Sequence, residues 1–311
     1  MGRLPMGANM TVTFLGTGAS WPTAQRGLSA VAVKRGGEVL LFDCGEGTQR
    51  QIQRSGLSYQ QISQIYLSHY HGDHCFGVPG LVKTMALNER DRPLWIFGPK
   101  GLDRMVEAWR QMGGWTRQFP IHVQEVAPGD VIERDGYNVE VHPADHSVQN
   151  VSFALQEPMR PGRFDKPKAL SLGIPEGRMF GQLQRGQSVT LDDGRTITPD
   201  VVLGPSRPGR RVVYSGDTQP CLGLLEAAKD ADLFICEASF TKDLVDRARE
   251  VKHMCAEEAA AVAVKAGARR LVLTHISPRY KEVAPVLEEA RAVYPEAEVA
   301  EDLQTFEVPF R

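Results

Sequence analysis

Apolar residues along most of the chain fall into two alternating patterns. Short β-rich runs are followed by longer segments whose apolar residues recur at helical spacing. This alternation predicts an α/β protein whose sheets are covered by helices. Strands are predicted at residues 11–15, 28–33, 38–42, 64–67, 94–97, 122–126, 137–142, 151–155, 211–214, 233–236 and 270–274, with closing strands after residue 294. Helices are predicted at residues 78–88, 101–112, 222–228, 256–266 and 283–294.

The alternation breaks between residues 157 and 195. This segment holds four prolines and several glycines, and it has little apolar periodicity except at Met179, Phe180 and Leu183. A loop of this length inside a compact domain is usually functional or disordered. Residues 158–187 also carry six basic against two acidic side chains, the one conspicuous basic segment of the chain. We therefore predict a tail over residues 1–10 and a single domain over residues 11–311, with a protruding basic arm inserted at about 157–195.

The composition is that of an ordinary folded protein. Of the 311 residues, 42% are hydrophobic and 24% are charged, which excludes disorder, coiled coil and collagen. No window offers the roughly 20 apolar residues of a membrane helix, and the start has no apolar core typical of a secretory signal. We expect a cytoplasmic protein without a membrane partner, and nothing in the sequence identifies a protein partner.

Cysteine content and charge narrow the function classes further. The five cysteines are scattered and never spaced as C-x-x-C, which disfavours a disulfide framework or a thiolate zinc site. With 36 Lys and Arg against 38 Asp and Glu, the formal net charge is -2. A nucleic-acid partner must therefore be argued from a local basic patch.

The strongest chemical signal is the segment SHYHGDH at residues 68–74, directly after an apolar strand. In extended backbone His69 and His71 point the same way, because side chains alternate in direction. Gly72 permits a turn that brings Asp73 and His74 back toward the same point. Three imidazoles and a carboxylate suit zinc or another divalent transition metal. A polar surface loop is the alternative, and it is disfavoured because four potential ligands fall within six residues of a chain with eight histidines.

One loop cannot complete two coordination spheres, so further ligands must come from elsewhere. His146 precedes the strand predicted at 151–155, and Asp217 and His275 each follow a predicted strand. In open α/β sheets, ligands gather beyond the carboxyl ends of strands. Each residue alone has an alternative as a turn or capping residue, and Asp217 alone favours capping of the next helix. Together with the histidine-rich segment they indicate a larger metal site.

These seven residues, in this order, resemble the metal-binding motif of the metallo-β-lactamase superfamily. The resemblance implies a four-layer αββα sandwich with a two-metal site at the loop ends. It does not specify the reaction, because lactam, thioester and phosphodiester hydrolases share the motif.

Other segments make the chain similar to the ribonuclease Z family of tRNA 3'-processing endonucleases, nearly throughout from Thr11. They are residues 13–20 (TFLGTGAS) with Pro22 and Arg26, 42–49 (FDCGEGTQ), 214–218 (YSGDT), 237–240 (EASF), His253 and 274–280 (THISPRY). The insert also resembles the flexible tRNA-gripping arm of that family, at residues 161–165 (PGRFD), 172–175 (LGIP) and 191–195 (LDDGR).

The resemblance implies two zinc ions per subunit, with manganese as an alternative metal. It places one ion on His69, His71 and His146. It places the other on Asp73, His74 and His275, with Asp217 bridging the two.

The resemblance also implies catalytic roles outside metal binding. Asp73 matches the family's proton acceptor, and His253 with Glu237 matches a second catalytic histidine with its orienting carboxylate. From the residues alone, His253 reads as a surface histidine before a helix, and Glu237 as a buried carboxylate in a turn.

Candidate RNA contacts lie in three places. Arg279 and Tyr280 follow His275, and they either contact a phosphate and stack on a base or lead into a helix. The resemblance implies that Arg26 and Thr23 lie near the tRNA 3' end. The candidates in the arm are Arg163, Lys166, Lys168, Arg178 and Arg185.

We therefore expect a zinc-dependent endoribonuclease that removes the 3' trailer from precursor tRNA, leaving a 3'-hydroxyl on the tRNA and a 5'-phosphate on the trailer. A basic arm can bind the tRNA through phosphate contacts although the whole chain is nearly neutral. The resemblance also implies a homodimer. One alternative is a small-molecule phosphodiesterase or arylsulfatase-like hydrolase of the same superfamily. Another is an RNA-binding module without catalysis, which the presence of Asp73, Glu237 and His253 disfavours.

Overall fold

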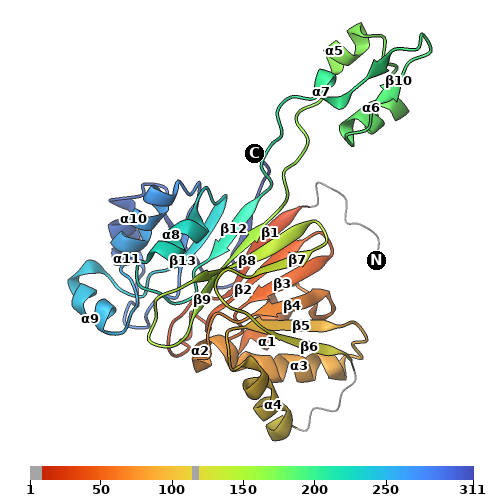
Figure 1. The fold of residues 1–311 in the computed structure, drawn as a ribbon. Helices are drawn as coiled ribbons and strands as arrows, with labels where there is room; N and C mark the ends of the chain where they lie inside the picture. Colours follow the sequence, from red (N-terminus) through yellow and green to blue (C-terminus); the bar gives the residue numbers. More distant parts are fainter. Residues whose placement is uncertain (1–8, 114–118) are drawn as a thin grey trace. The chain divides into compact units, whose positions relative to one another are not determined.

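The computed structural model describes residues 9–113 and 119–311 of the chain (Figure 1). The chain divides into two compact units. The first comprises the residues up to Gln156 and residues 211–309, and the second comprises residues 157–210 with residues 310–311.

The first unit is built on two seven-stranded sheets, each part parallel and part antiparallel. The first sheet has the strand order β16-β1-β2-β3-β4-β5-β6. Its strands are β1 (Met10–Gly16), β2 (Ala30–Arg35), β3 (Glu38–Phe42), β4 (Ile62–Tyr66), β5 (Leu94–Gly98), β6 (Ile121–Glu125) and β16 (Thr305–Glu307). Strands β3 to β6 run parallel to one another, so their C-terminal ends lie at one edge of the sheet.

The second sheet has the order β15-β14-β13-β12-β9-β8-β7. Its strands are β7 (Val131–Arg134), β8 (Tyr137–Pro143), β9 (Val151–Gln156), β12 (Arg211–Tyr214), β13 (Leu233–Glu237), β14 (Leu271–Thr274) and β15 (Glu298–Val299). Strands β12 to β15 are parallel, and β9 is antiparallel to both β12 and β8. Strands β8, β12 and β14 therefore end at the same edge.

Alternating side chains divide the apolar residues of each strand between two layers. In β2, Val31 and Val33 pack in the core between the sheets, whereas Ala30 and Ala32 pack on the outer face against helices. The helices over the first sheet are α1 (Thr48–Ser55), α3 (Gly77–Leu87) and α4 (Leu102–Gly113). Those over the second sheet are α8 (Leu222–Ala228), α10 (Ala256–Ala266) and α11 (Ala284–Arg291). Figure 1 shows the resulting four layers, and the predicted αββα sandwich is confirmed.

Shorter helical segments connect these layers. They are η1 (Tyr59–Gln61), α2 (Gly72–Cys75), η2 (Lys242–Leu244) and α9 (Val245–Glu250).

Every predicted strand and helix has a counterpart, and β3, β12, α8 and α10 have the predicted bounds. In the first unit, helices α1, α2 and α9 and strand β7 were not predicted. Helix α1 has a single large apolar residue, Ile52, so its sequence TQRQIQRS shows no apolar periodicity although Ile52 is fully buried. Strand β7 is a four-residue edge strand with one buried position, too short to give a pattern.

The second unit is folded where the sequence pattern suggested a loop. It contains α5 (Lys166–Ser171), α6 (Arg178–Gln184), β10 (Val189–Thr190), β11 (Thr196–Ile197) and α7 (Pro199–Val202). Its small core includes Phe180 and Leu183, two of the few periodic apolar residues of this segment. The predicted insert at 157–195 lies within this unit, which continues to Arg210.

Two predictions concern the chain outside these layers. Of the predicted tail at 1–10, residues 1–8 lie outside the described residues, and Met10 is the first residue of β1. Among the described helices, none has the length and apolar character needed to cross a membrane.

Candidate metal centre

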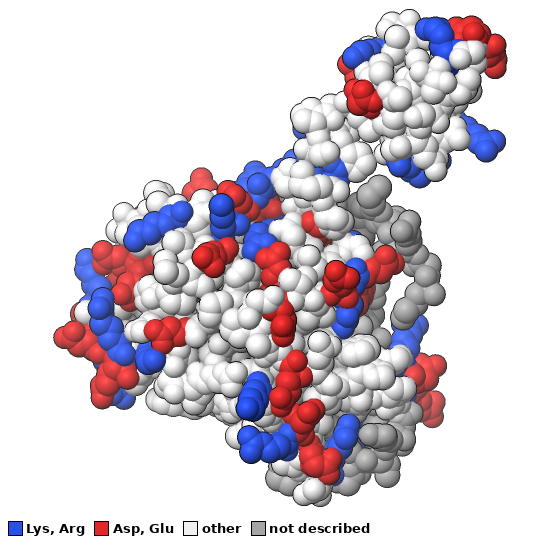
Figure 2. Space-filling model, in the orientation of Figure 1, with Lys and Arg blue, Asp and Glu red and all other residues white. Residues whose placement is uncertain are grey.

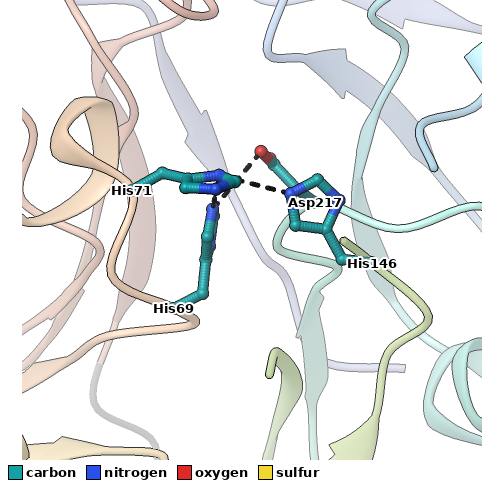
Figure 3. A group of neighbouring side chains, drawn as sticks. All are labelled: His69, His71, His146 and Asp217. Carbon is teal, nitrogen blue, oxygen red and sulfur yellow. Dashed lines mark hydrogen bonds and ion pairs between the residues drawn. The ribbon is translucent and has the colours of Figure 1, made fainter. Parts of the chain in front are cut away.

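A cluster of imidazoles and carboxylates lies where strand ends of the two sheets meet. His69 and His71 follow β4 of the first sheet, whereas His146, Asp217 and His275 follow β8, β12 and β14 of the second. Because β8, β12 and β14 end at the same edge of their sheet, the loops that follow them lie close together, and the loop after β4 of the first sheet meets them there. In Figure 3, His69 and His71 point across the gap toward His146 and Asp217.

The first group of candidate ligands is His69, His71, His146 and Asp217, whose ligand atoms all lie within 4.8 Å of one another. The Nδ1 atom of His71 is 3.0 Å from Nε2 of His69 and 3.3 Å from Nε2 of His146. The carboxylate Oδ2 of Asp217 is 3.6 Å from Nε2 of His69.

The second group is Asp73, His74 and His275. The Nε2 atoms of His74 and His275 are 3.2 Å apart, and Oδ2 of Asp73 is 3.7 Å and 3.5 Å from them. Asp217 contacts this group as well, with Oδ2 3.2 Å from His74 Nε2 and Oδ1 3.4 Å from His275 Nε2. Asp217 therefore lies between the two groups. The structure thus brings together all seven residues that the sequence singled out as ligands.

Four of the five imidazoles in these groups have Nδ1 engaged outside the cluster. His74 Nδ1 bonds the Asp43 carboxylate at 2.7 Å, and His146 Nδ1 donates to the backbone carbonyl of Lys252 at 3.0 Å. His69 Nδ1 lies 2.9 Å from the Ser68 hydroxyl, and His275 Nδ1 lies 2.8 Å from the Ser239 hydroxyl. Each hydroxyl already donates to a carboxylate, so it accepts from the imidazole. This bonding leaves the Nε2 atoms of His69, His74, His146 and His275 facing the cluster.

The donor set fits a divalent transition metal. Lone pairs of Nε2 atoms that face one another at about 3 Å repel unless a proton or a cation lies between them. Oδ1 of Asp217 is buried and makes no hydrogen bond within the described part of the chain. Buried polar atoms without partners are rare in folded proteins, and a metal ion is one of the groups that satisfies them.

The protonation states also suit a cation. Burial lowers the pKa of His69, His71 and His146, so these imidazoles are neutral at neutral pH. Burial alone would raise the pKa of Asp217, but His275 and His74 hold it well below its usual range. Burial alone would also lower the pKa of His74, but the carboxylates of Asp217 and Asp43 raise it well above its usual range. Metals bind neutral imidazoles and ionised carboxylates, so a metal ion that binds here displaces the proton of His74.

Asp43, directly after β3, positions the ligands and was given no role in the sequence analysis. Its Oδ2 accepts hydrogen bonds from the hydroxyls of Ser68 and Tyr214 at 2.8 and 2.7 Å and from His74 at 2.7 Å. Its Oδ1 accepts from the backbone amide of Ser68 at 2.7 Å. The available signal was an acidic residue directly after the apolar run VLLF at residues 39–42, within the FDCGEGTQ segment.

His253 and Glu237 lie beside the second ligand group. His253 Nδ1 is 2.8 Å from Glu237 Oε1, and the imidazole stacks on His275 at 5.3 Å between ring centres. Glu237 is almost fully buried and also accepts from the Thr218 amide and the Ser239 hydroxyl. Burial alone would lower the pKa of His253, but the charge and hydrogen bond of Glu237 raise it to about 9. Glu237 therefore fixes the orientation of His253 and favours its protonated form.

The candidate RNA contacts of the first unit make hydrogen bonds within the fold. Arg26 donates to the Ala300 carbonyl at 2.7 Å, and its backbone amide donates to the Thr23 hydroxyl at 3.0 Å. Arg279 donates to the Ser277 hydroxyl at 2.9 Å. The Tyr280 hydroxyl accepts from the Thr241 amide at 2.9 Å. These contacts fix the side chains, and their part in RNA binding remains a prediction.

The five candidate RNA contacts of the insert all lie in the second unit and are exposed. Lys166 pairs with Glu176 at 2.9 Å, while Asp192, Asp193 and Asp200 follow in the same unit. On the face seen in Figure 2, blue and red side chains both occur on this unit. These three acidic residues are balanced by Arg195, Arg207 and Arg210, so residues 158–210 keep the basic surplus of residues 158–187.

Comparison with family models gives two matches. Residues 10–157 match the model described as anti-Pycsar protein Apyc1, and residues 182–276 match the beta-lactamase superfamily domain. Together the two matches span much of both sheets of the first unit and its histidine-rich loop.

Individual proteins are similar over nearly the whole chain. Ribonuclease Z of Methanosarcina acetivorans is 46% identical over 97% of this chain and 99% of its own length. Ribonuclease Z of Myxococcus xanthus is also 46% identical, with the same coverage. Among solved structures, human tRNase Z, short form, superposes with a TM-score of 0.71 at 27% identity, over 96% of this chain and 100% of its own.

The Asp43→Asn substitution should weaken metal binding about 10- to 100-fold, because an amide cannot accept the same set of hydrogen bonds that fixes His74. Competition between the protein and a chromogenic chelator for zinc measures this change. Glu46→Gln is the matched control, since it removes an exposed carboxylate three residues away. Equal zinc affinity in both variants, with unchanged thermal unfolding, would contradict the positioning role of Asp43.

Proposed function

The chain belongs to the ribonuclease Z family and is a nuclease of the metallo-β-lactamase superfamily, and we propose that it cleaves the 3' trailer from precursor tRNA with two zinc ions. The products in this proposal are a tRNA with a 3'-hydroxyl and a trailer with a 5'-phosphate. The observation that carries the proposal is the pair of ligand groups joined by Asp217, beside the His253 and Glu237 pair.

In this proposal His69, His71 and His146 hold one zinc ion, Asp73, His74 and His275 hold the other, and Asp217 contacts both. When bound, the two ions supply an activated water at neutral pH and positive charge for the phosphate. The chain's own contribution is the fixed orientation of the imidazoles through Asp43, Ser68 and Ser239.

His253 acts as the general acid in this proposal. Cleavage that leaves a 3'-hydroxyl on the tRNA expels the 3' oxygen, which needs a proton. Glu237 bonds Nδ1 of His253, so the other ring nitrogen, Nε2, is left to deliver a proton. The raised pKa of His253 keeps it protonated near neutral pH.

Asp73 acts as the proton acceptor. Its Oδ2 accepts a hydrogen bond from the Ser20 amide at 2.7 Å and lies beside His74 and His275. Burial alone would raise its pKa, but these imidazoles lower it, so Asp73 is ionised at neutral pH. Its side chain keeps some exposure, which a group that receives a proton requires.

The proposal extends to the second unit and to assembly. The exposed basic residues of the insert bind tRNA phosphates, and the protein works as a homodimer in the cytoplasm. The family resemblance supports both parts, and the quoted arm segments at 161–165 and 172–175 support the first.

The function is tested by end-mapped cleavage of a precursor tRNA with a 3' trailer, in zinc or manganese. We expect one metal-dependent cut at the end of the acceptor stem, which Asp73→Ala abolishes. Hydrolysis of bis-p-nitrophenyl phosphate is measured beside it. Hydrolysis of this ester together with intact precursor tRNA would favour a small-molecule phosphodiesterase.

The His253→Ala substitution should lower kcat for precursor tRNA about 10²- to 10⁴-fold, the usual contribution of a general acid. Hydrolysis of bis-p-nitrophenyl phosphate should change little, because p-nitrophenolate leaves without protonation. His122→Ala, at an exposed histidine of β6, is the control. An equal loss on both substrates would assign His253 a structural role instead.

Replacement of residues 164–203 by a two-residue Asn-Gly turn should lower kcat/KM for precursor tRNA by a factor on the order of 100 or more, since phosphate contacts dominate affinity for nucleic acids. The ends of the excised segment are close, because the Gly204 amide donates to the Arg163 carbonyl at 2.9 Å. Cleavage of precursor tRNA at the full rate by this variant would remove the second unit from the proposal. Small-ester hydrolysis reports whether its metal centre is intact.

A further inference from the structure

The loop between β1 and β2, residues 17–29, borders the candidate metal centre. The Ser20 amide donates to Asp73 Oδ2 at 2.7 Å. On the other side of the loop, the Ala19 amide donates to the carbonyl of Ile276, the residue after His275, at 3.1 Å. The loop therefore contacts Asp73 of the second ligand group and the backbone that follows His275.

Both ends of this loop are fixed. Asp302 accepts hydrogen bonds from the Thr17 hydroxyl and from the Gly27 amide, each at 2.7 Å. The Gly18 amide closes the loop by donating to the Gly27 carbonyl at 2.8 Å. Arg26 anchors it again at the Ala300 carbonyl. Residues 20–25 are thus held in place at their base, beside the centre.

Trp21, at the tip of this loop, is 62% exposed. Its backbone position is defined, because its amide donates to the Ala19 carbonyl at 2.7 Å and Ser20 before it has a left-handed backbone with φ 63°. By contrast, Trp109 is buried between the first sheet and its helices. Trp95 is half-buried and packs against the core between the two sheets. Single exposed apolar residues are common on proteins. Trp21 differs from such residues because its backbone is fixed and because the amide of the preceding residue, Ser20, donates to Asp73.

We propose that Trp21 is the stacking platform for a nucleobase next to the scissile phosphate, an inference that rests on the proposed function. The trailer of a precursor tRNA is single-stranded, and its sequence varies. Every base has a π-face, so stacking on an indole tolerates any sequence. Unpaired RNA bases are recognised in this way because they are free to splay out.

Stacking adds what the metal centre does not provide. Metal ligands position a phosphate, and all phosphates of an RNA strand are alike. A base held on Trp21 fixes which phosphate lies at the centre, so this contact sets the register of the strand. Trp21 is therefore a positioning residue for the cut as well as a source of affinity.

The test compares Trp21→Ala, Trp21→Phe and a control, Val264→Ala, which shortens another exposed apolar side chain, in α10. For precursor tRNA, Trp21→Ala should raise KM about 5- to 150-fold, the range expected for one lost base stack. It should also produce cuts at neighbouring phosphodiesters. Trp21→Phe should recover most of the affinity, and bis-p-nitrophenyl phosphate should be hydrolysed at the wild-type rate by all three variants.

A second readout is independent of turnover. Precursor tRNAs with 2-aminopurine on either side of the cut are bound to the cleavage-deficient His71→Ala protein, which keeps the contact between Ser20 and Asp73. Fluorescence quenching at one of the two positions should be lost when Trp21→Ala is added, and retained with Val264→Ala.

Two outcomes overturn the inference, and they are distinguishable. If the wild type cleaves precursor tRNA and Trp21→Ala matches it in KM and cut position, the stacking role fails while the proposed function stands. If the wild type leaves precursor tRNA intact, the proposed function fails and the stacking role falls with it.

Discussion

The candidate metal centre depends on the hydrogen bonds that the buried carboxylate of Asp43 accepts. Asp43 follows β3 of the first sheet, yet it accepts a hydrogen bond from Tyr214 at the end of β12 in the second sheet. It also bonds Ser68 and His74, which belong to the histidine-rich loop after β4. A buried charge is costly unless donors surround it, and four hydrogen bonds meet that requirement here. One group therefore joins both sheets to the ligand loop at the edge where the candidate metal ligands gather.

Sequence patterns predicted the strands and most of the helices because these elements bury one regular face, and the family resemblance implied the four-layer sandwich. They also indicated the ligand types, because His69, His71, Asp73 and His74 are close in sequence. They did not reveal Asp43, whose role depends on contacts with Tyr214 across the two sheets. Long-range pairs of this kind leave no local periodicity. Helix α1 was missed for a related reason, since a helix with one buried large apolar residue relies on the surrounding core rather than on its own pattern.

The second unit shows a different limit of pattern reading. Its apolar core is small, and small cores rarely stabilise a fold alone. Additional contacts join the two ends of residues 157–210, where Arg210 and Glu157 form a buried bidentate ion pair at 2.8 Å. The centre of the Phe310 ring lies 3.8 Å from the guanidinium carbon of Arg160 and 3.8 Å from that of Arg210. These partners are separated by 53 to 150 positions along the chain, so their contacts leave no local sequence pattern. The prolines and glycines of the segment therefore suggested a loop.

The metal ligands cannot by themselves determine the substrate. The same ligand order supports several hydrolytic reactions, because the ligands address only the reacting group and its oxygens. Specificity must come from residues that contact the remainder of the substrate, and these lie in segments where the apolar pattern is weakest. In the first unit such a segment is the loop around Trp21, which is fixed at Asp302 and Ala300 and contacts Asp73 through Ser20. Because this loop is anchored to the centre through backbone hydrogen bonds, a base held on it is held in register with the reacting phosphate.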